Sequence, residues 1–145
     1  MKKKRKRTLM LVILVVALAA LYSNGKAVLP HVVHTSAPAN ERLANRMAAS
    51  YGWTGKQVTC LDELWQRESG FSVTADTRRS GLDPPGARVY AYGIPQARPA
   101  DKMASAGADW RTNAVTQVTW GLRYVRDTYG NPCGAWDHEM AWNWY

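Results

Sequence analysis

The sequence predicts a mainly α-helical single domain over residues 38–145, with at most a small β element, preceded by an N-terminal signal or anchor segment. Apolar residues recur at steps of three and four in three separate stretches of this range, and that is the period of an amphipathic helix. No internal repeat is visible. About 108 residues are enough for one hydrophobic core and too few for two.

Residues 1–22 have the pattern of a signal peptide or an N-terminal membrane anchor. Six basic residues in a row, 2–7, precede an unbroken apolar run, 9–21. A run of about 13 residues suits the core of a signal peptide and is short for a membrane span, which needs about 20. The basic cluster holds the N-terminus in the cytoplasm. No clean small-x-small cleavage site follows, so we expect export, with cleavage and retention as an anchor both open.

Most of the positive charge belongs to this leading segment. The formal charge of the chain is +8 at pH 7, and residues 2–7 carry six of those charges, which leaves +2 for the rest. A mildly basic domain can be attracted weakly to an anionic surface, but this balance does not call for nucleic acid. We therefore expect an exported protein with no nucleic-acid partner.

Residues 23–37 read as a linker, because they show no helical or strand period long enough to assign. His31 and His34 are spaced to share a metal, yet no Cys, Asp or Glu in the linker could complete such a site. We expect two solvated histidines and no metal.

Helices or helical turns are expected at four places besides the centre of the domain, over 38–50, 99–107, 113–129 and 135–144. Asn40 is placed to cap the first of them, and Gly52 to stop it. The stretch over 72–92 is irregular and contains two adjacent prolines. It is either a short two- or three-stranded element or a loop over a cleft.

The domain is organised around a helix over 54–70. Thr54 and Gln57 fit a capping box at its N-terminus, and Gly70 is placed to take the left-handed conformation that ends it. Its core-facing stripe has one acid among apolar side chains and consists of Val58, Leu61, Leu64, Trp65, Glu68 and Phe71.

Glu68 is that acid, and it lies in the last turn of the helix. Burial raises the pKa of a carboxyl, since the charged form loses water, and the negative end of the helix dipole acts in the same direction. A carboxyl kept protonated near neutral pH can serve as a general acid. The alternative is a Glu68 that turns to solvent, or that pairs with Arg67 or another arginine. Periodicity alone does not decide between a general acid and a solvated or ion-paired Glu68.

The chain has two cysteines, Cys60 in the central helix and Cys133 after the longest helix. In an exported protein an isolated pair is most simply a disulfide. That bond would join the central helix to the C-terminal segment. Two separate buried thiols are the alternative.

Seven Trp and seven Tyr are a heavy aromatic content for a domain of this size. Aromatic faces stack on sugar rings, but they also fill cores. Trp65 and Trp120 fall on apolar stripes, and we expect both in the core. Several aromatic residues crowd the stretch over 136–145, and some of them must lie near the surface.

Three segments of the chain, in a fixed order, carry a resemblance to a known family. They read WQRESGF over 65–71, AYGIPQA over 91–97 and KMASAGADWRTN over 102–113. From about residue 40 to residue 145 the chain resembles the lytic transglycosylase-like domain of exported actinobacterial proteins. That family belongs with the lysozyme-like, goose-type superfamily. Glu-Ser-Gly alone is a weak signal, whereas the three segments in this order are specific.

The resemblance implies an activity and a set of site residues. Glu68 matches the single catalytic acid/base, and Ser69 matches the residue that often assists at the reacting sugar. Gln96 matches the glutamine that lines the glycan groove, and Tyr92 and Gly93 would shape the groove beside it. The implied reaction cleaves peptidoglycan between N-acetylmuramic acid and N-acetylglucosamine, giving 1,6-anhydromuramyl products without a metal or cofactor.

The resemblance also implies where the protein acts. We expect a monomer that works on glycan strands of the cell wall, either secreted or held at the membrane by residues 1–22.

The chain departs from the family pattern in the loop over 75–92, which is longer than usual and carries Asp76 and Asp83. Glycoside hydrolysis normally needs a second carboxylate beside the acid, and these two are the plausible candidates. Two alternatives to a transglycosylase therefore stay open: a hydrolytic muramidase on the same fold, and a non-catalytic module that binds the cell wall.

Overall fold

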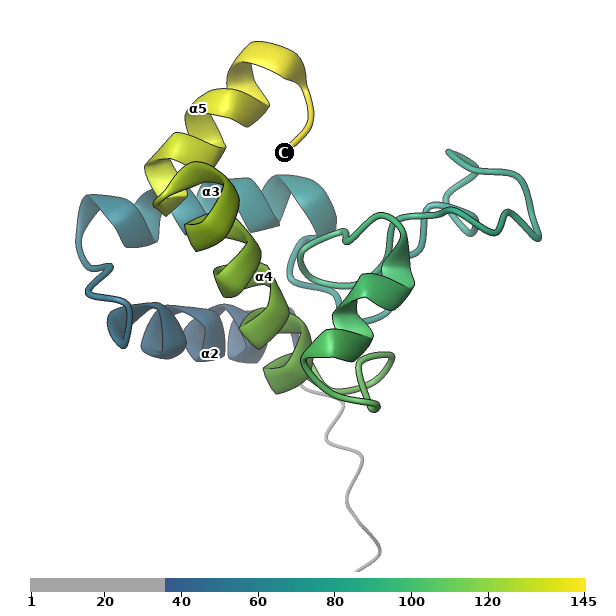
Figure 1. The fold of residues 1–145 in the computed structure, drawn as a ribbon, viewed down its shortest axis with the longest axis horizontal. Coiled ribbons are helices and arrows are strands. Elements are labelled where there is room, and N and C mark those ends of the chain that lie inside the picture. Colours follow the sequence, from purple (N-terminus) through teal and green to yellow (C-terminus); the bar gives the residue numbers. More distant parts are fainter. Residues whose placement is uncertain (1–35) are drawn as a thin grey trace, which may run out of the picture. The chain divides into compact units, whose positions relative to one another are not determined.

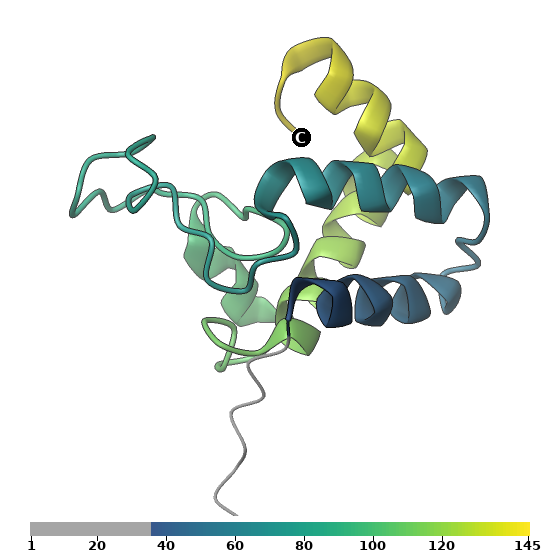
Figure 2. The ribbon, with the colours of Figure 1, turned by 180° about the vertical axis from the view of Figure 1, so that it is seen from behind.

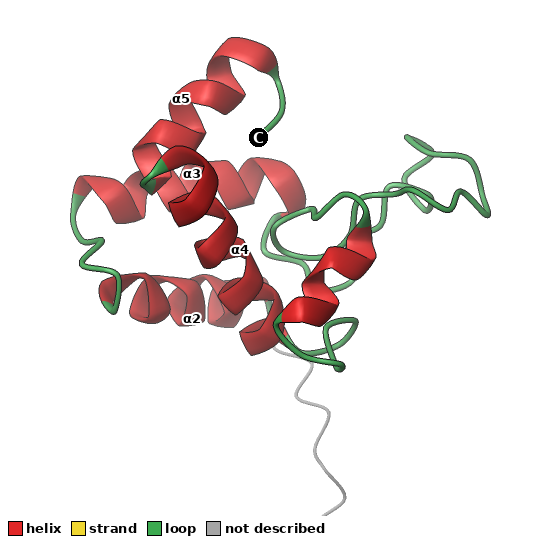
Figure 3. Cartoon of the chain, viewed as in Figure 1, coloured by secondary structure: helices red, strands yellow, loops and turns green. Residues whose placement is uncertain are grey.

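The computed structural model describes residues 36–145, and its regular structure is almost wholly helical (Figures 1 and 3). Five helices follow one another in the order α2 (Ala37–Ala49), α3 (Lys56–Ser69), η1 (Ala100–Ser105), α4 (Ala114–Tyr129) and α5 (Pro132–Trp142), of which η1 is a 3-10 helix. β pairing within residues 36–145 is limited to two isolated bridges, both made by Tyr92. The prediction of a mainly α domain with at most a small β element is confirmed.

The described residues fall within one compact unit. No helix between residues 36 and 145 is long and apolar enough to cross a membrane. The predicted signal or anchor segment over 1–22, and the predicted linker up to residue 35 with His31 and His34, lie outside the described residues.

Helices α2 and α3 form an antiparallel pair joined by a short turn, and α4 crosses this pair before the chain turns into α5 (Figures 1 and 2). α3 packs most extensively against α5, and it also contacts α2. α4 packs against α2, α5 and η1. The predicted central helix, α3, therefore lies between the first and the last helix of the domain.

The main core draws buried side chains from α2, α3, α4 and α5. Leu61, Leu64 and Trp65 of α3 are fully buried, so the predicted apolar stripe is confirmed along most of its length. Gly121 of α4 lets the Trp65 ring approach the backbone closely, because a Cβ at this position would lie 2.6 Å from the ring. Burying three large side chains in this way stabilises the domain by about 1.5–3 kcal/mol each.

The predicted cap of the first helix is wrong. α2 begins three residues before Asn40, with Ser36 at the N-cap and a proline in the first turn, where its missing N–H costs nothing. Asn40 is instead buried within the helix, and its Nδ2 donates a hydrogen bond of 2.8 Å to the carbonyl of Phe71. It therefore ties α2 to the chain just after α3.

The predicted capping box of α3 is also wrong, while its predicted C-cap is confirmed. Gly55 is the N-cap residue, and no side chain caps this end. Gln57 faces α5, where its Oε1 accepts a hydrogen bond of 3.0 Å from the Cys133 N–H. Gly70 takes the left-handed conformation with φ 57°, so α3 ends where the sequence predicted. A tertiary contact has replaced the local cap.

The last two helices both begin at an asparagine. Asn113 caps α4 by accepting a hydrogen bond from the Val115 N–H, as expected for a helix over 113–129. Asn131 caps α5 in the same way through the Gly134 N–H, with Pro132 as the first helical residue. α5 therefore starts three residues earlier than the predicted 135–144, because an Asn-Pro pair is a strong helix start.

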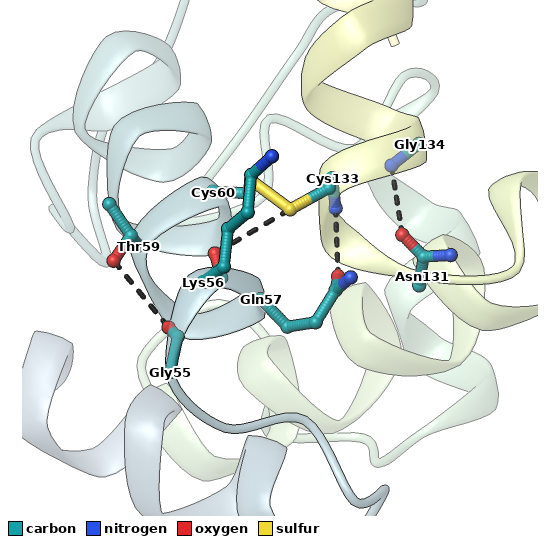
Figure 4. The surroundings of a disulfide bond; sticks show 8 residues. All are labelled: Gly55, Lys56, Gln57, Thr59, Cys60, Asn131, Cys133 and Gly134. Atoms are coloured by element: carbon teal, nitrogen blue, oxygen red, sulfur yellow. Dashed lines mark hydrogen bonds between the residues drawn. A yellow bond between two sulfur atoms is a disulfide. The ribbon is translucent and has the colours of Figure 1, made fainter.

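A disulfide joins Cys60 of α3 to Cys133 of α5, with an S–S distance of 2.12 Å and a Cα–Cα distance of 5.0 Å (Figure 4). The predicted pairing is confirmed. The bond and the neighbouring Gln57 contact fix the two helices that pack most extensively against each other.

The stretch over 72–92 contains no regular element apart from the two isolated bridges, and part of it projects away from the helices (Figures 1 and 2). Of the two predicted possibilities, the loop is the one observed.

Candidate active site

Glu68 is the penultimate residue of α3, at the end where the backbone turns through Gly70. Its side chain is partly buried. The pKa of Glu68 is raised from 4.5 to about 7, mainly by burial and then by the negative charge of Glu139, while Arg67 opposes the shift. At neutral pH about half of the Glu68 carboxyls therefore carry a proton that they can donate.

Glu139 of α5 is the second acid at this end of α3, and the sequence reasoning missed it. Its side chain is only 4% exposed, and its Oε1 accepts a hydrogen bond of 2.8 Å from Arg67 Nε. Its other oxygen, Oε2, is buried and accepts no hydrogen bond within the described part of the chain. A signal was present, since Pro132, Ala135 and Glu139 are the buried residues of α5 and recur at steps of three and four.

Tyr145, the last residue of the sequence, also lies within the electrostatic reach of Glu68. Its hydroxyl accepts a hydrogen bond of 2.8 Å from Trp65 Nε1 and donates one of 2.8 Å to the Pro95 carbonyl. Burial raises the pKa of the Tyr145 phenol, and the charge of Glu68 raises it further. Tyr145 therefore stays protonated, and its hydroxyl connects Trp65 of α3 to the segment around Pro95.

The charges of both acids also act on the pKa of Tyr129, at the C-terminal end of α4. Burial, Tyr124 and then the charges of Glu139 and Glu68 raise the pKa of the Tyr129 phenol. Four parts of the chain therefore meet around Glu68: the ends of α3 and α4, the last turns of α5, and the C-terminal tyrosine.

A small cavity of about 60 Å³ opens beside this group, with Tyr145 in its wall. Its lining consists of Pro95, Gln96, Ala97, Arg98, Lys102, Trp120, Tyr124 and Tyr145. The rings of Trp120 and Tyr124, which both line the cavity, stack with centroids 5.1 Å apart and planes 9° apart. Trp65 is in the core as predicted, whereas Trp120 is only partly buried and lines the cavity.

The four predicted substrate-binding residues divide into one that lines the cavity and three that do not. Gln96 lines it, and its Nε2 donates a hydrogen bond of 2.9 Å to the Gly93 carbonyl. Ser69 donates a hydrogen bond of 2.8 Å to the Ile94 carbonyl, which fixes the segment over 93–96 against the end of α3. Ser69 thus positions the chain that carries Gln96.

Gly93 and Tyr92 also act on the shape of this segment. Gly93 has φ 76°, and a Cβ there would lie 2.5 Å from the Gln117 side chain, so only glycine fits. Tyr92 packs edge-on against Trp110, with ring centroids 5.6 Å apart, and its hydroxyl donates to the Arg111 carbonyl. Tyr92 belongs to the small core beside η1 and does not line the cavity.

The two loop acids, Asp76 and Asp83, are both occupied by arginines. Both oxygens of Asp76 accept hydrogen bonds from Arg78, at 3.1 and 2.8 Å. Both oxygens of Asp83 accept from Arg98, at 2.7 and 3.0 Å, and Oδ2 also accepts from the Thr77 hydroxyl. These bonds lower the pKa of each carboxyl. Neither is among the groups that shift the pKa of Glu68.

The described residues contain no group of three or more His, Cys, Asp or Glu that could hold a metal ion. No protein-family model, curated protein or solved structure matches this chain. The arrangement itself offers a carboxyl that can donate a proton at the C-terminal end of α3, and a cavity with aromatic and basic residues in its wall, and Tyr145 belongs to both surroundings.

Proposed function

We propose that the chain is a peptidoglycan lytic transglycosylase with a lysozyme-like domain, and that Glu68 is its single acid/base. The observation that carries the proposal is the environment of Glu68, whose burial raises its pKa to about 7. A general acid is most effective when its pKa lies near the working pH. The predicted motif and this environment agree on the same residue.

The proposed reaction needs one carboxyl in two protonation states. Protonated Glu68 donates its proton to the glycosidic oxygen as the bond from that oxygen to C1 of N-acetylmuramic acid breaks. The resulting carboxylate then takes the proton of the muramyl C6 hydroxyl as the C6 oxygen bonds to C1. The products are a 1,6-anhydromuramyl end and a free 4-hydroxyl on N-acetylglucosamine. An internal nucleophile has a high effective concentration, so no second carboxylate is needed to position water.

The neighbouring cavity supplies groups suited to a sugar. Trp120 and Tyr124 both line the cavity, and an aromatic face can pack against the apolar face of a pyranose. Gln96 and Lys102 supply hydrogen-bonding groups at its rim. Tyr145 lines the cavity, and the charge of Glu68 acts on its phenol, so on this proposal the scissile bond lies between a sugar at the cavity and its neighbour at Glu68.

The pairing of the loop acids disfavours the hydrolytic alternative that uses them. Asp76 and Asp83 each accept two hydrogen bonds from an arginine, so neither is available to activate water without breaking an ion pair. A hydrolytic muramidase would therefore need another base. On this proposal the enzyme acts on glycan strands outside the cytoplasmic membrane, whether residues 1–22 are cleaved or retained.

The test is mass spectrometry of fragments that the purified full chain releases from peptidoglycan. We expect anhydromuramyl ends, one water lighter than hydrolysed ends. Glu68→Gln should lower release by a factor of about 10²–10⁴, the usual contribution of general acid–base catalysis. Glu63→Gln is the matched control, because Glu63 is an exposed acid of the same helix. It should leave release unchanged.

Each other outcome assigns a different function. Reducing muramyl ends would mean that water is the nucleophile and would favour the muramidase. No release from several wall types, with binding to insoluble peptidoglycan retained, would favour a wall-binding module.

A further inference from the structure

Arg67 precedes the proposed acid in the sequence, yet its guanidinium bonds to another helix. Its Nε donates to Glu139 Oε1 at 2.8 Å, and its Nη2 donates to Asn143 Oδ1 at 2.7 Å. Both acceptors come from α5 and the residue that ends it. Two hydrogen bonds in different directions fix a planar guanidinium better than one ion pair does.

Both acceptors are themselves held in place. Glu139 is almost fully buried on α5, and the disulfide between Cys60 and Cys133 fixes that helix to α3. Asn143 has φ 61°, and its N–H donates a hydrogen bond of 2.7 Å to the Glu139 carbonyl. A left-handed Asn at a helix end is favourable, so the side-chain oxygen is presented to Arg67 at low cost.

This arrangement matters because Arg67 could otherwise pair with Glu68. The charge of Arg67 already opposes the rise in the pKa of Glu68, and an arginine side chain is long and flexible, with its guanidinium always charged. An ion pair with Arg67 would favour the ionised form of Glu68 and so remove the proton that a general acid needs. Arg67 is about half exposed, so it has room to move if its acceptors on α5 are lost.

We propose that Glu139 and Asn143 are positioning residues, which hold the Arg67 guanidinium on α5 and so keep it from pairing with Glu68. The consequence for catalysis rests on the proposed function, whereas the effect on the protonation of Glu68 does not. The ionisable groups that face Glu68 are Arg67 from its own helix, Glu139 from α5, Tyr129 from α4 and Tyr145 from the C-terminus.

The first test is a carbon-13 NMR titration of the side-chain carboxyls in the full chain, with the Glu68 signal identified by its loss in Glu68→Gln. In the unmodified protein we expect a midpoint near pH 7. Glu139→Gln should lower this midpoint by at least about one pH unit, since a like charge is lost and Arg67 is released. Asp137→Asn removes an exposed acid of the same helix and should shift the midpoint by no more than a few tenths. An unchanged or raised midpoint in Glu139→Gln would overturn the proposal.

A second variant separates the release of Arg67 from the loss of a like charge. In an Arg67→Gln background, Glu139→Gln can act only through the lost like charge, so its shift should be clearly smaller than in the unmodified protein. Equal shifts in the two backgrounds would mean that Arg67 takes no part, and would overturn its role.

A variant at Asn143 tests the same idea if Glu139→Gln fails to fold. Asn143→Gly keeps the left-handed backbone and removes one of the two acceptors, so it should lower the Glu68 midpoint by less than Glu139→Gln does. Arg67→Gln alone should raise the midpoint, because it removes the positive charge that opposes the shift. A midpoint that Asn143→Gly leaves unchanged would contradict the positioning role of Asn143.

The activity readout distinguishes the two proposals from each other. If the chain is a transglycosylase, the alkaline limb of its pH–rate profile should move to lower pH in Glu139→Gln by the same amount as the NMR midpoint. A chain without turnover, but with the expected NMR shifts, would refute the proposed function and leave the positioning role standing.

Discussion

The domain buries acids in two regions and treats them in opposite ways. In the loop over 76–98, the side chains of Asp76 and Asp83 are only 4% and 10% exposed, and each is fully paired with an arginine. At the junction of α3 and α5, Arg67 forms an ion pair with Glu139 but none with Glu68, and one oxygen of Glu139 has no hydrogen bond from the described residues. We call the second region the acid junction.

The difference shows that an arginine partner decides whether a carboxyl with little exposure to solvent stays ionised. Arginine pairs lower the pKa of both loop acids, so these stay ionised and hold the loop together. At the acid junction, burial and then the negative charge of Glu139 outweigh the opposing charge of Arg67 and raise the pKa of Glu68 to about 7. A site that keeps a proton near neutral pH pays for it in stability, and that cost can be measured.

The largest expected effect comes from removing the disulfide that joins α3 to α5, the two helices of the acid junction. The disulfide closes a loop with a sequence separation of 73, and the lost chain entropy of such a loop corresponds to about 4 kcal/mol. Replacing both cysteines by alanine should lower the free energy of unfolding by about that amount, measured by urea denaturation. The control is the unmodified protein with reductant, which should show a similar loss. An unchanged unfolding midpoint in both samples would contradict a structural role of the bond.

The second prediction is that Glu68→Gln stabilises the protein at alkaline pH. Glu68 has a pKa of about 7 in the folded chain and 4.5 when solvated, so ionising it costs up to about 3 kcal/mol of stability. The folded state binds more protons than the unfolded state between these values, so the stability of the unmodified protein falls as the pH rises from about 4.5 to 7. The gain in Glu68→Gln should be fully present above pH 8 and absent near pH 4. Urea denaturation at both pH values measures it.

The exposed Glu63 again supplies the control. Glu63→Gln should change stability by no more than about 0.5 kcal/mol at either pH, as surface substitutions usually do. A Glu68→Gln protein that is less stable than the unmodified one at pH 8 would mean that Glu68 is ionised and paired, and would remove the basis for a general acid.

The same contrast explains what could be predicted from the sequence. The helices over 38–50, 54–70 and 113–129 were predictable because their apolar period survives in the packed chain. The partly buried position of Glu68 was predictable because this acid interrupts such an apolar stripe. The errors lie where a distant contact replaced a local one: Asn40 bonds to Phe71, and Gln57 bonds to Cys133, so neither serves as a cap.

The candidate site was harder to predict for the same physical reason. Glu139 and Tyr145 reach Glu68 only because α5 packs on α3 and the chain then turns back, and no short-range pattern encodes that path. Asp76 and Asp83 looked available because their arginine partners are not evident from the sequence. Asp83 pairs with Arg98, which lies 15 positions away. Partner identity is a property of the folded chain.

The smallest expected effect on stability comes from Asp83→Asn. This substitution should destabilise the protein at pH 7, whereas Glu68→Gln should stabilise it at alkaline pH. Asp83→Asn breaks a bidentate pair with Arg98, so it should lower the Tm by a few degrees at pH 7. The loss is limited because Arg98 is half exposed and water screens the pair. Since pairing lowers the pKa of Asp83, its contribution is present above the ordinary Asp pKa of about 3.9 and disappears as the pH falls through the lowered value.

Thermal unfolding from pH 7 down to pH 2 measures this difference, with Asp137→Asn as the exposed control. The folded fraction of Asp83→Asn should still release anhydromuramyl fragments from peptidoglycan, because Asp83 supports the loop and does not reach Glu68. If Asp83→Asn kept its Tm and lost release, the two regions would not be separate. The loop acid would then take part in the chemistry, and the hydrolytic mechanism would become the better account of the site.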